Sequence, residues 1–311
     1  MPPRSHLPKV TVVVPTHERE TSLVLAVRSV LGQTFTDFEL LLVDDGSGAD
    51  FAAMLAGPSE DVRFEVIRSD ENRGPAAARN LGIARARGAY IAFLDSDDIW
   101  LNDKLERQLA FMEAQPISPR VCCTGYRVVT PFRPAGETRV SRPAVRFSDL
   151  LWGCGLSPGS TMVVEKSLFD EVGLFDESLR RLEDWDWLLR CVQKTPVTVM
   201  PGVLAIVHAS AREDYPLEAV LDSASRIRDY VDRGRYPLER RQRTTMLSTL
   251  HSEIAAAAFR RRHYRLAVIS LLRSMYHNPF RRIDYYRRIL GALSADLWAA
   301  IRSRLGLRSS D

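Results

Sequence analysis

The features missing from this 311-residue sequence argue against several protein classes. Its cysteines lack the paired spacing of a zinc site or a disulfide framework, which favours reduced thiols in a cytosolic compartment. They are Cys122, Cys123, Cys154 and Cys191. No apolar run approaches the roughly 18 residues of a membrane span, and the opening MPPRSHLPKV has no apolar core of signal-peptide length. We therefore expect a cytoplasmic protein that is neither exported nor integral to a membrane.

Two common nucleotide-binding motifs are also missing. No G-x-x-x-x-G-K-[ST] sequence occurs, which argues against a P-loop. GSGADF, at residues 46–51, lacks the third glycine of a dinucleotide-binding fingerprint. Nucleotidyl transfer is disfavoured as well, because the expected Gly-rich, Lys-containing loop near the N-terminus is absent.

Lysine is absent from the last 91 residues, and the two parts of the chain carry opposite charge. Residues 221–311 hold 19 Arg against 8 Asp and Glu, a balance of +11, whereas residues 1–220 have a balance of −7. The overall composition, 45% apolar and 26% charged, is that of a globular protein. The change in charge indicates two regions, which we place at residues 1–215 and 216–311.

Short β-rich runs alternate with helical patterns through the first hundred residues. Leu23–Leu31 has helical spacing and ends at Gly32, and a second helix opens at Pro75 and runs through Arg87. The alternation predicts an α/β fold with a doubly wound, Rossmann-like, mostly parallel sheet flanked by helices. The predicted strands are Val10–Val14, Phe38–Val43, Val62–Ile67 and Tyr90–Leu94.

The later chain is expected to be mixed at first and then helical. Strands are predicted at 121–129, 160–164 and 197–207, with a helix at 181–192. Beyond residue 216 a helical C-terminal extension is predicted, with helices near 217–232, 238–260, 263–276 and 281–305.

Polar clusters follow three of the predicted strands. They are Pro15-Thr16-His17-Glu18, Asp44-Asp45-Gly46-Ser47 and Asp95-Ser96-Asp97-Asp98. Ligands bind beyond the carboxyl ends of strands in an open parallel sheet, so neighbouring strands would bring the clusters together. Each cluster also has a structural explanation, because DDGS is a common turn and DSDD could cap the next helix.

Helix capping accounts for one carboxylate, whereas three follow the strand Tyr90–Leu94 within four positions. Carboxylates this close repel each other and raise each other's pKa. A divalent cation would relieve the repulsion, since Mg²⁺ and Mn²⁺ take oxygen ligands and complete their shells with substrate phosphates. Asp95-Ser96-Asp97 is therefore a candidate anchor for a nucleotide diphosphate.

Four stretches together make the chain resemble the family 2 glycosyltransferases, inverting enzymes of the GT-A fold. The stretches are VTVVVPTHER, QTFTDFELLLVDDGS, ENRGPAAARNLGIARARGAYIAFLDSDD and RRLEDWDWLLR. They occur in the family's order and spacing between about Lys9 and Ala211. His17-Glu18 stands where relatives often have Tyr-Asn, and nothing beyond residue 216 matches a catalytic motif.

The resemblance implies a role for each matching residue. Asp184 would be the catalytic base, with Glu183 as the reserve candidate. Asp97 would be the direct metal ligand, with Asp95 nearer the ribose and His208 close to the metal and diphosphate. The nucleotide site would be formed by Pro15, Thr16, Glu18, Asp44, Asp45, Arg79 and Asp95, with Asp45 hydrogen-bonded to the base.

The implied reaction moves a sugar from a nucleotide-diphosphate sugar, expected to be a UDP sugar, to a hydroxyl of a saccharide or lipid-linked acceptor. Mn²⁺ or Mg²⁺ would act as a Lewis acid, and Asp184 would deprotonate the acceptor. The expected setting is synthesis of cell-surface polysaccharide or glycoconjugate. WGCGLSPGS, at residues 152–160, is expected to border the acceptor site, because its glycines permit a close-fitting loop. Acidic residues such as Glu183-Asp184 also suit the first turn of a packed helix.

The arginine-rich C-terminal region, residues 216–311, has two interpretations at this point. It could present a solvated face over a packed core, or it could attach peripherally to the inner face of the membrane. An apolar stripe at helical spacing supports both equally, and partner binding is a further alternative. The stripe comprises Phe280, Ile283, Tyr286, Leu290, Leu293, Leu297 and Ile301. Nucleic-acid binding is not expected, because no recognised module occurs.

Two other functions compete with glycosyl transfer. Haloacid-dehalogenase-type phosphatases also have Asp-x-Asp after a strand, but normally after the first strand, whereas here it follows the fourth. A catalytically silent glycosyltransferase-like binding or scaffold protein is the second alternative. The intact D-x-D and Glu183-Asp184 motifs argue against it.

Overall fold

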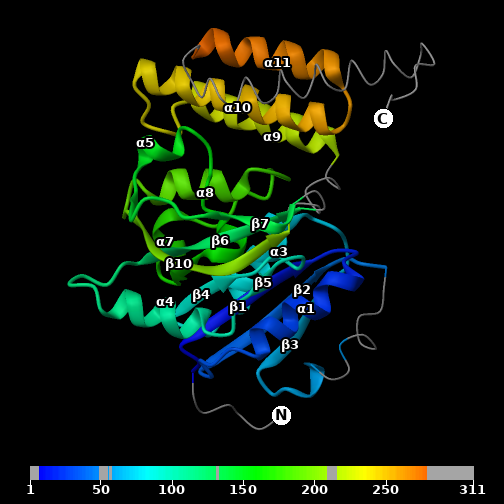
Figure 1. Ribbon diagram of the computed structural model, residues 1–311, viewed down its shortest axis with the longest axis vertical. Coiled ribbons are helices and arrows are strands. Elements are labelled where there is room, and N and C mark those ends of the chain that lie inside the picture. The colour runs from blue at the N-terminus through cyan, green and yellow to red at the C-terminus, as the bar shows by residue number, and fades with distance from the viewer. Residues whose placement is uncertain (1–6, 49–54, 56–57, 131–132, 209–215, 279–311) are drawn as a thin grey trace, which may run out of the picture. The chain divides into compact units, whose positions relative to one another are not determined.

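The computed structural model describes residues 7–48, 55, 58–130, 133–208 and 216–278 (Figure 1). The chain divides into two compact units, Met1–Tyr215 and Pro216–Asp311, which we call unit 1 and unit 2. No helix in the described ranges is long and apolar enough to cross a membrane.

Unit 1 is organised by one mixed sheet among its described residues. The strands are β1 Val10–Thr16, β2 Phe38–Asp45, β3 Phe64–Ser69, β4 Tyr90–Phe93, β5 Ile99–Trp100, β6 Val121–Thr130, β7 Arg133–Arg139, β8 Ala144–Val145, β9 Val163–Glu165 and β10 Val197–His208. Their order is β3-β2-β1-β4-β9-β6-β10-β5, with β7 beside β6 and β8 beside β10. The helices are α1 Glu20–Leu31, α3 Pro75–Arg85, α4 Lys104–Glu113, α5 Phe147–Leu150, α6 Pro158–Thr161, α7 Leu168–Val172 and α8 Glu183–Cys191.

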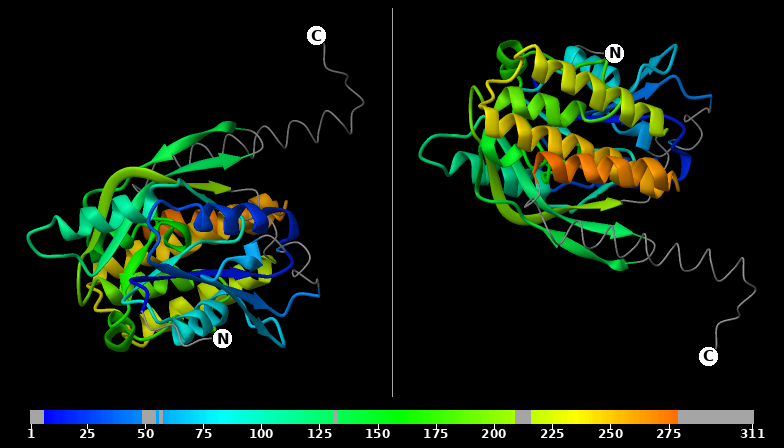
Figure 2. Two further views of the ribbon diagram at one scale, coloured as in Figure 1. Left: turned by 90° about the horizontal axis from the view of Figure 1, so that it is seen from below. Right: turned by 90° about the horizontal axis from the view of Figure 1, so that it is seen from above.

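The predicted parallel pairing holds for the first four strands. β2 lies between β3 and β1, β1 lies between β2 and β4, and all three pairs are parallel. The β1-α1-β2 and β3-α3-β4 connections run in opposite directions along the sheet. Right-handed crossovers therefore place α1 and α3 on opposite faces, which Figure 2 shows.

The second half of the sheet is not purely parallel. β9 is antiparallel to both of its neighbours, β4 and β6, whereas β10 is parallel to β6. The fold is therefore α/β with a mostly parallel first half and a mixed second half. The doubly wound pattern predicted from strand–helix alternation thus extends through β4 and not into the later strands, whose sequences do not alternate with helices in the same way.

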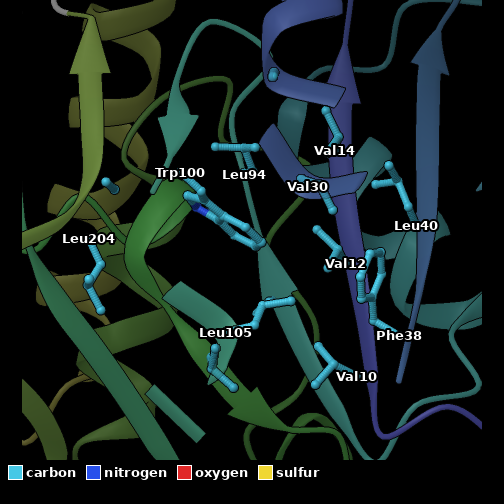
Figure 3. Close-up of a cluster of buried hydrophobic side chains, with 14 of the residues drawn as sticks. Val10, Val12, Val14, Val30, Phe38, Leu40, Leu94, Trp100, Leu105 and Leu204 are labelled. Atoms are coloured by element: carbon cyan, nitrogen blue, oxygen red, sulfur yellow. The ribbon is translucent and has the colours of Figure 1, made fainter. Parts of the chain in front are cut away.

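Strands β1 and β2 are buried along their whole length, which explains their nearly continuous apolar sequences. Side chains alternate between the faces of a strand. Val10, Val12 and Val14 belong to the core cluster that includes Val30 of α1 (Figure 3). Val13 faces α3, where Gly82 leaves room for it: a Cβ on Gly82 would come within 2.4 Å of a Val13 methyl group.

Several predicted boundaries were wrong. The strand predicted at Val62–Ile67 runs from Phe64 to Ser69, and the strand predicted to reach Leu94 ends at Phe93. The helix predicted to reach Arg87 ends at Arg85, and Ala86 is already extended. The strand predicted from Ser160 begins at Val163, because Pro158–Thr161 forms the short helix α6. Ser157 has a left-handed backbone with φ 49°, and its carbonyl oxygen accepts from the Ser160 and Thr161 amides.

The described part of unit 2 is helical, as predicted. It contains α9 Leu217–Asp232, α10 Arg240–Arg260 and α11 Tyr264–His277. An apolar cluster joins α9, α10 and α11 through Leu217, Ala258 and Ala267. The helix predicted at 281–305, with its apolar stripe, lies outside the described residues.

Candidate active site at the carboxyl edge of the sheet

The three polar clusters lie along one edge of the sheet, because β1 is the neighbour of both β2 and β4. The clusters after β1 and β2 contact each other directly. The Glu18 amide donates to Ser47 Oγ at 3.1 Å, and the Gly48 amide donates to Glu18 Oε1 at 2.7 Å. The convergence predicted from the strand ends is confirmed.

Asp44 and Asp45 are buried and fix the loops at this edge. Asp44 Oδ1 accepts from the Ser47 amide at 3.0 Å. The two carboxylate oxygens of Asp45 accept from the amides of Arg73 at 2.9 Å and Gly74 at 2.6 Å. Any contact of Asp45 with a nucleoside base would therefore be an additional hydrogen bond, for which a carboxylate oxygen has capacity.

The carboxylates after β4 form a tight turn, in which the Asp98 amide donates to the Asp95 carbonyl at 3.0 Å. Burial, together with the charge of Asp95, raises the pKa of Asp97 to about 6. Burial also raises the pKa of Asp98, and the neighbouring carboxylates add to that rise. A cation bound next to these carboxylates would stabilise their ionised form.

Asp98 connects the turn to two distant segments. Its Oδ2 accepts from the hydroxyl of Ser160, and the same hydroxyl accepts from the Asp95 amide at 3.2 Å. Its Oδ1 accepts from the His208 amide at 2.9 Å. The third carboxylate of the motif thus supports the turn, a role that sequence reasoning missed because its partners are 62 and 110 residues away.

The position of His208 fits a metal site. Its Nδ1 lies 2.7 Å from the Asp97 carbonyl oxygen, which can only accept a hydrogen bond. Nδ1 therefore donates this hydrogen bond, which leaves Nε2 as the ring nitrogen that a metal ion would take.

In the part of the chain that the structure describes, no three His, Cys, Asp or Glu side chains form a group that could hold a metal ion. A nucleotide-linked Mg²⁺ or Mn²⁺ needs fewer, since one or two carboxylates suffice when substrate phosphates complete the shell. The carboxylates of Asp95 and Asp97 meet that smaller requirement by their chemistry, and His208 adds a nitrogen donor beside the turn.

Arg79 joins the turn after β4 to the start of α8. Its Nη2 donates to Asp95 Oδ1 at 2.6 Å, and its Nη1 donates to Glu183 Oε1 at 2.7 Å. Burial alone would lower the pKa of Arg79, but the charges of Asp95 and Glu183 outweigh it, so the guanidinium is firmly protonated. A residue expected only to shape the nucleotide site therefore bridges two predicted motifs.

Glu183 and Asp184 are adjacent but differ in environment. Glu183 is buried and paired with Arg79; burial raises its pKa, and the ion pair opposes that rise. Asp184 is only partly buried, and its Oδ1 accepts from the Trp185 amide at 2.7 Å. Leu182, with φ 65°, precedes both residues and sets the direction in which α8 begins.

The end of β1 presents a polar atom without a partner. Thr16 is buried, and its hydroxyl has no hydrogen-bond partner among the described residues. Pro15 beside it has no amide hydrogen to offer. A buried hydroxyl of this kind is costly unless a ligand or water binds it, which suits the predicted nucleoside contact.

The glycine-rich loop at 152–160 reaches the D-x-D turn. A Cβ on Gly159 would lie 2.5 Å from Asp95 Oδ2, so only glycine allows this approach. Gly155 has no atom within 4 Å of the corresponding position. The glycines at 152–160 indicate a close-fitting loop in the sequence, but the sequence does not predict that Gly159 lies against Asp95.

The chain matches glycosyl transferase family 2 over residues 11–171, which is more than half of its length. The chain therefore belongs to this family. An uncharacterized glycosyltransferase of Rickettsia conorii is 49% identical over 105 residues, 34% of this chain and 17% of that protein. The matches to this and two further Rickettsia relatives span less than a fifth of those proteins.

A longer match is to the Escherichia coli UDP-Glc:alpha-D-GlcNAc-diphosphoundecaprenol beta-1,3-glucosyltransferase WfgD. It is 32% identical over 161 residues, which are 52% of this chain and 62% of WfgD.

Solved structures confirm the GT-A fold expected from the resemblance. TarS 1-349 of S. aureus in complex with UDP-GlcNAc has a TM-score of 0.59 and 17% identity, covering 87% of this chain and 92% of that chain. The mannosyltransferase PcManGT from Pyrobaculum calidifontis, in complex with GDP-Man and Mn²⁺, has a TM-score of 0.57 and 17% identity, covering 96% and 83%. At these identities the likeness establishes the fold alone.

Proposed function

We propose that the chain is a metal-dependent inverting glycosyltransferase that uses a nucleotide-diphosphate sugar, with UDP sugars as the leading donors. The proposed acceptor is a hydroxyl of a saccharide or lipid-linked saccharide in cell-surface polysaccharide synthesis. The name of WfgD, which specifies UDP-Glc and a diphosphoundecaprenol acceptor, supports both choices. We place the activity in residues 1–215 and assign no catalytic group to residues 216–311.

One contact carries this proposal: Arg79 holds Asp95 of the D-x-D turn and Glu183 at the start of α8. The two segments are 88 residues apart in sequence, yet a single guanidinium binds both. The carboxylates that would hold the donor therefore lie close to the pair that supplies the base, as a direct displacement requires.

The donor site in this proposal uses the residues at the sheet edge. Asp95, Asp97 and His208 would hold Mn²⁺ or Mg²⁺, which supplies Lewis-acid stabilisation of the departing diphosphate when bound. Thr16 would contribute its unpartnered hydroxyl to the nucleoside. Pro15, Asp44 and Asp45 are buried at the ends of β1 and β2, and their burial keeps that surface fixed, whereas Glu18 is exposed beside them.

Asp184 is our candidate for the base. The acceptor oxygen attacks the anomeric carbon, its proton passes to the Asp184 carboxylate, and the bond from that carbon to the diphosphate oxygen breaks. Glu183 is less suited, because its carboxylate is buried and bound to Arg79. Asp184 is partly accessible and lies in the first turn of α8, where the helix dipole attracts negative charge.

A transfer assay tests the proposal. The purified chain is incubated with Mn²⁺, a panel of UDP, GDP and dTDP sugars, and saccharide or diphospholipid-linked acceptors, and nucleotide release and product mass are measured. We expect one donor to be consumed with a mass gain of one sugar on the acceptor. Binding of a nucleotide sugar without turnover for any acceptor would favour the silent binding protein instead.

A further inference from the structure

Helix α11 is packed against α10 by one face only. Ala267, Ser270, Leu271 and Ser274 are buried, and they recur at helical spacing. The Ser248 hydroxyl of α10 donates to the Ser274 carbonyl at 2.9 Å. The orientation of α11 within unit 2 is therefore set by a face that combines Ala267 and Leu271 with two buried serines.

The opposite side of α11 is apolar and exposed. We call it the outer face and define it by Val268, Ile269, Leu272 and Tyr276, which are 38%, 37%, 60% and 86% exposed. A solvated helix normally has polar residues on the side away from its core, and a helix that is apolar on both sides is normally covered. The outer face is thus suited to contact with a second apolar phase.

The described segment that contains the outer face carries charged side chains of one sign. Between Ile254 and Asn278 the sequence has five arginines and no acidic residue. Arg265 and Arg273 are exposed on α11 itself. On a helix of 3.6 residues per turn, Arg265 falls on the same side as Leu272 and Tyr276. Apolar side chains interleaved with arginine are typical of helices that lie in the interface of an anionic bilayer.

We propose that the outer face of α11 docks on an anionic lipid surface. Leu272 and Tyr276 would enter the boundary between head groups and acyl chains, and the arginines would meet the head-group phosphates. Two copies of the chain meeting through this face would bring their arginines together, which disfavours self-association. The inference rests on the proposed function in one respect: an enzyme with a lipid-linked acceptor works at a membrane.

Vesicle flotation of the full chain tests the docking without any need for enzymatic activity. Vesicles of phosphatidylcholine with phosphatidylglycerol are compared with phosphatidylcholine alone. We expect binding only to the anionic vesicles, with loss of binding at high salt. Arg265→Gln should weaken binding about fivefold, the effect of removing one basic group from such a surface.

Leu272→Glu should weaken binding at least as much as Arg265→Gln, because it places a carboxylate in the apolar contact. Leu25→Glu is the matched control, since Leu25 is 54% exposed on α1 in unit 1. Circular dichroism of both variants verifies that each is folded. Equal binding by the two variants, or no binding of the wild type to anionic vesicles, would overturn the proposal.

A labelling experiment identifies other occupants of the face. In the full chain carrying Leu272→Cys, we expect rapid reaction with a soluble maleimide and slower reaction once anionic vesicles are added. The wild type gives the background from its own cysteines. Slow reaction in the absence of vesicles would mean that residues 279–311 or a second copy cover the face, and it would refute the membrane proposal.

A failure of docking leaves the proposed transferase function in place, because transfer to a water-soluble acceptor does not depend on it. We expect Leu272→Glu to transfer to such an acceptor at the wild-type rate. If the wild-type chain binds anionic vesicles but transfers no sugar to any acceptor, this inference is supported and the proposed function is refuted.

Discussion

The adjacent carboxylates Glu183 and Asp184 should separate stability from catalysis when each is replaced. Glu183 is buried, and its ion pair with Arg79 has an N–O distance of 2.7 Å. Glu183→Ala would leave the buried guanidinium with Asp95 as its remaining carboxylate partner. Removing one partner of a buried ion pair costs roughly 3–5 kcal/mol, and the retained Asp95 contact favours the lower end of that range.

Asp184→Asn should behave in the opposite way. Its contact with the Trp185 amide can be kept by the Asn side-chain oxygen. The Asp184 charge attracts Arg79 and repels Glu183, two effects of opposite sign, and it also interacts with the first turn of the helix. Such an interaction is worth about 0.3–1 kcal/mol. Transfer should nevertheless fall by roughly 10²–10⁴-fold, the usual contribution of a general base.

Urea unfolding at neutral pH and steady-state transfer kinetics measure the two effects side by side. The expected outcome is a destabilised Glu183→Gln protein that retains measurable transfer and a stable Asp184→Asn protein that binds donor without turnover. Gln is used for kinetics because it preserves an acceptor for Arg79. Full activity in Asp184→Asn, with activity lost in a stable Glu183→Gln protein, would reverse the assignment.

Three further predictions concern the surroundings of the site. Burial lowers the pKa of Lys104 to about 7, so the unfolded state binds more protons above that pH and the free energy of unfolding rises toward pH 10.5. In urea unfolding, Lys104→Met should therefore raise the free energy of unfolding by about 2 kcal/mol more at about pH 7 than at about pH 9. An equal increase at both pH values would contradict this. Gly159→Ala should lower kcat roughly 10²-fold by displacing Asp95, whereas Gly155→Ala should match the wild type; equal kinetics of the two would refute the contact. Asp97→Asn should keep or raise Tm, because it removes repulsion with Asp95, and should abolish metal-dependent donor binding in calorimetry; a large fall in Tm would argue against that repulsion.

Local patterns predicted the first half of the fold well. The apolar runs of β1 and β2 are buried on both sides, and each ends where a polar cluster begins, so strand, direction and binding edge could all be inferred. Gly32 and Pro75 marked helix ends that the structure confirms. These features depend on neighbours in sequence, which is why the sequence was enough.

The parts that could not be predicted depend on distant partners. The sequence predicts a strand from Ser160, yet the Ser160 hydroxyl binds Asp98 and its backbone is helical. The link from Arg79 to Glu183 spans 104 residues, and no local pattern marks it. Similarly, the reversal of β9 is set by its pairing with β4 and β6, not by its own composition.

Calorimetric titration of the chain with UDP, with and without Mn²⁺, tests the central claim most directly. The account predicts binding that requires the metal in the wild type and is lost in Asp97→Asn while that variant remains folded. Metal-independent binding that survives in Asp97→Asn would contradict the assignment of the D-x-D turn. No response of a folded chain to UDP, GDP or dTDP in the presence of Mn²⁺ would contradict the proposed use of a nucleotide sugar.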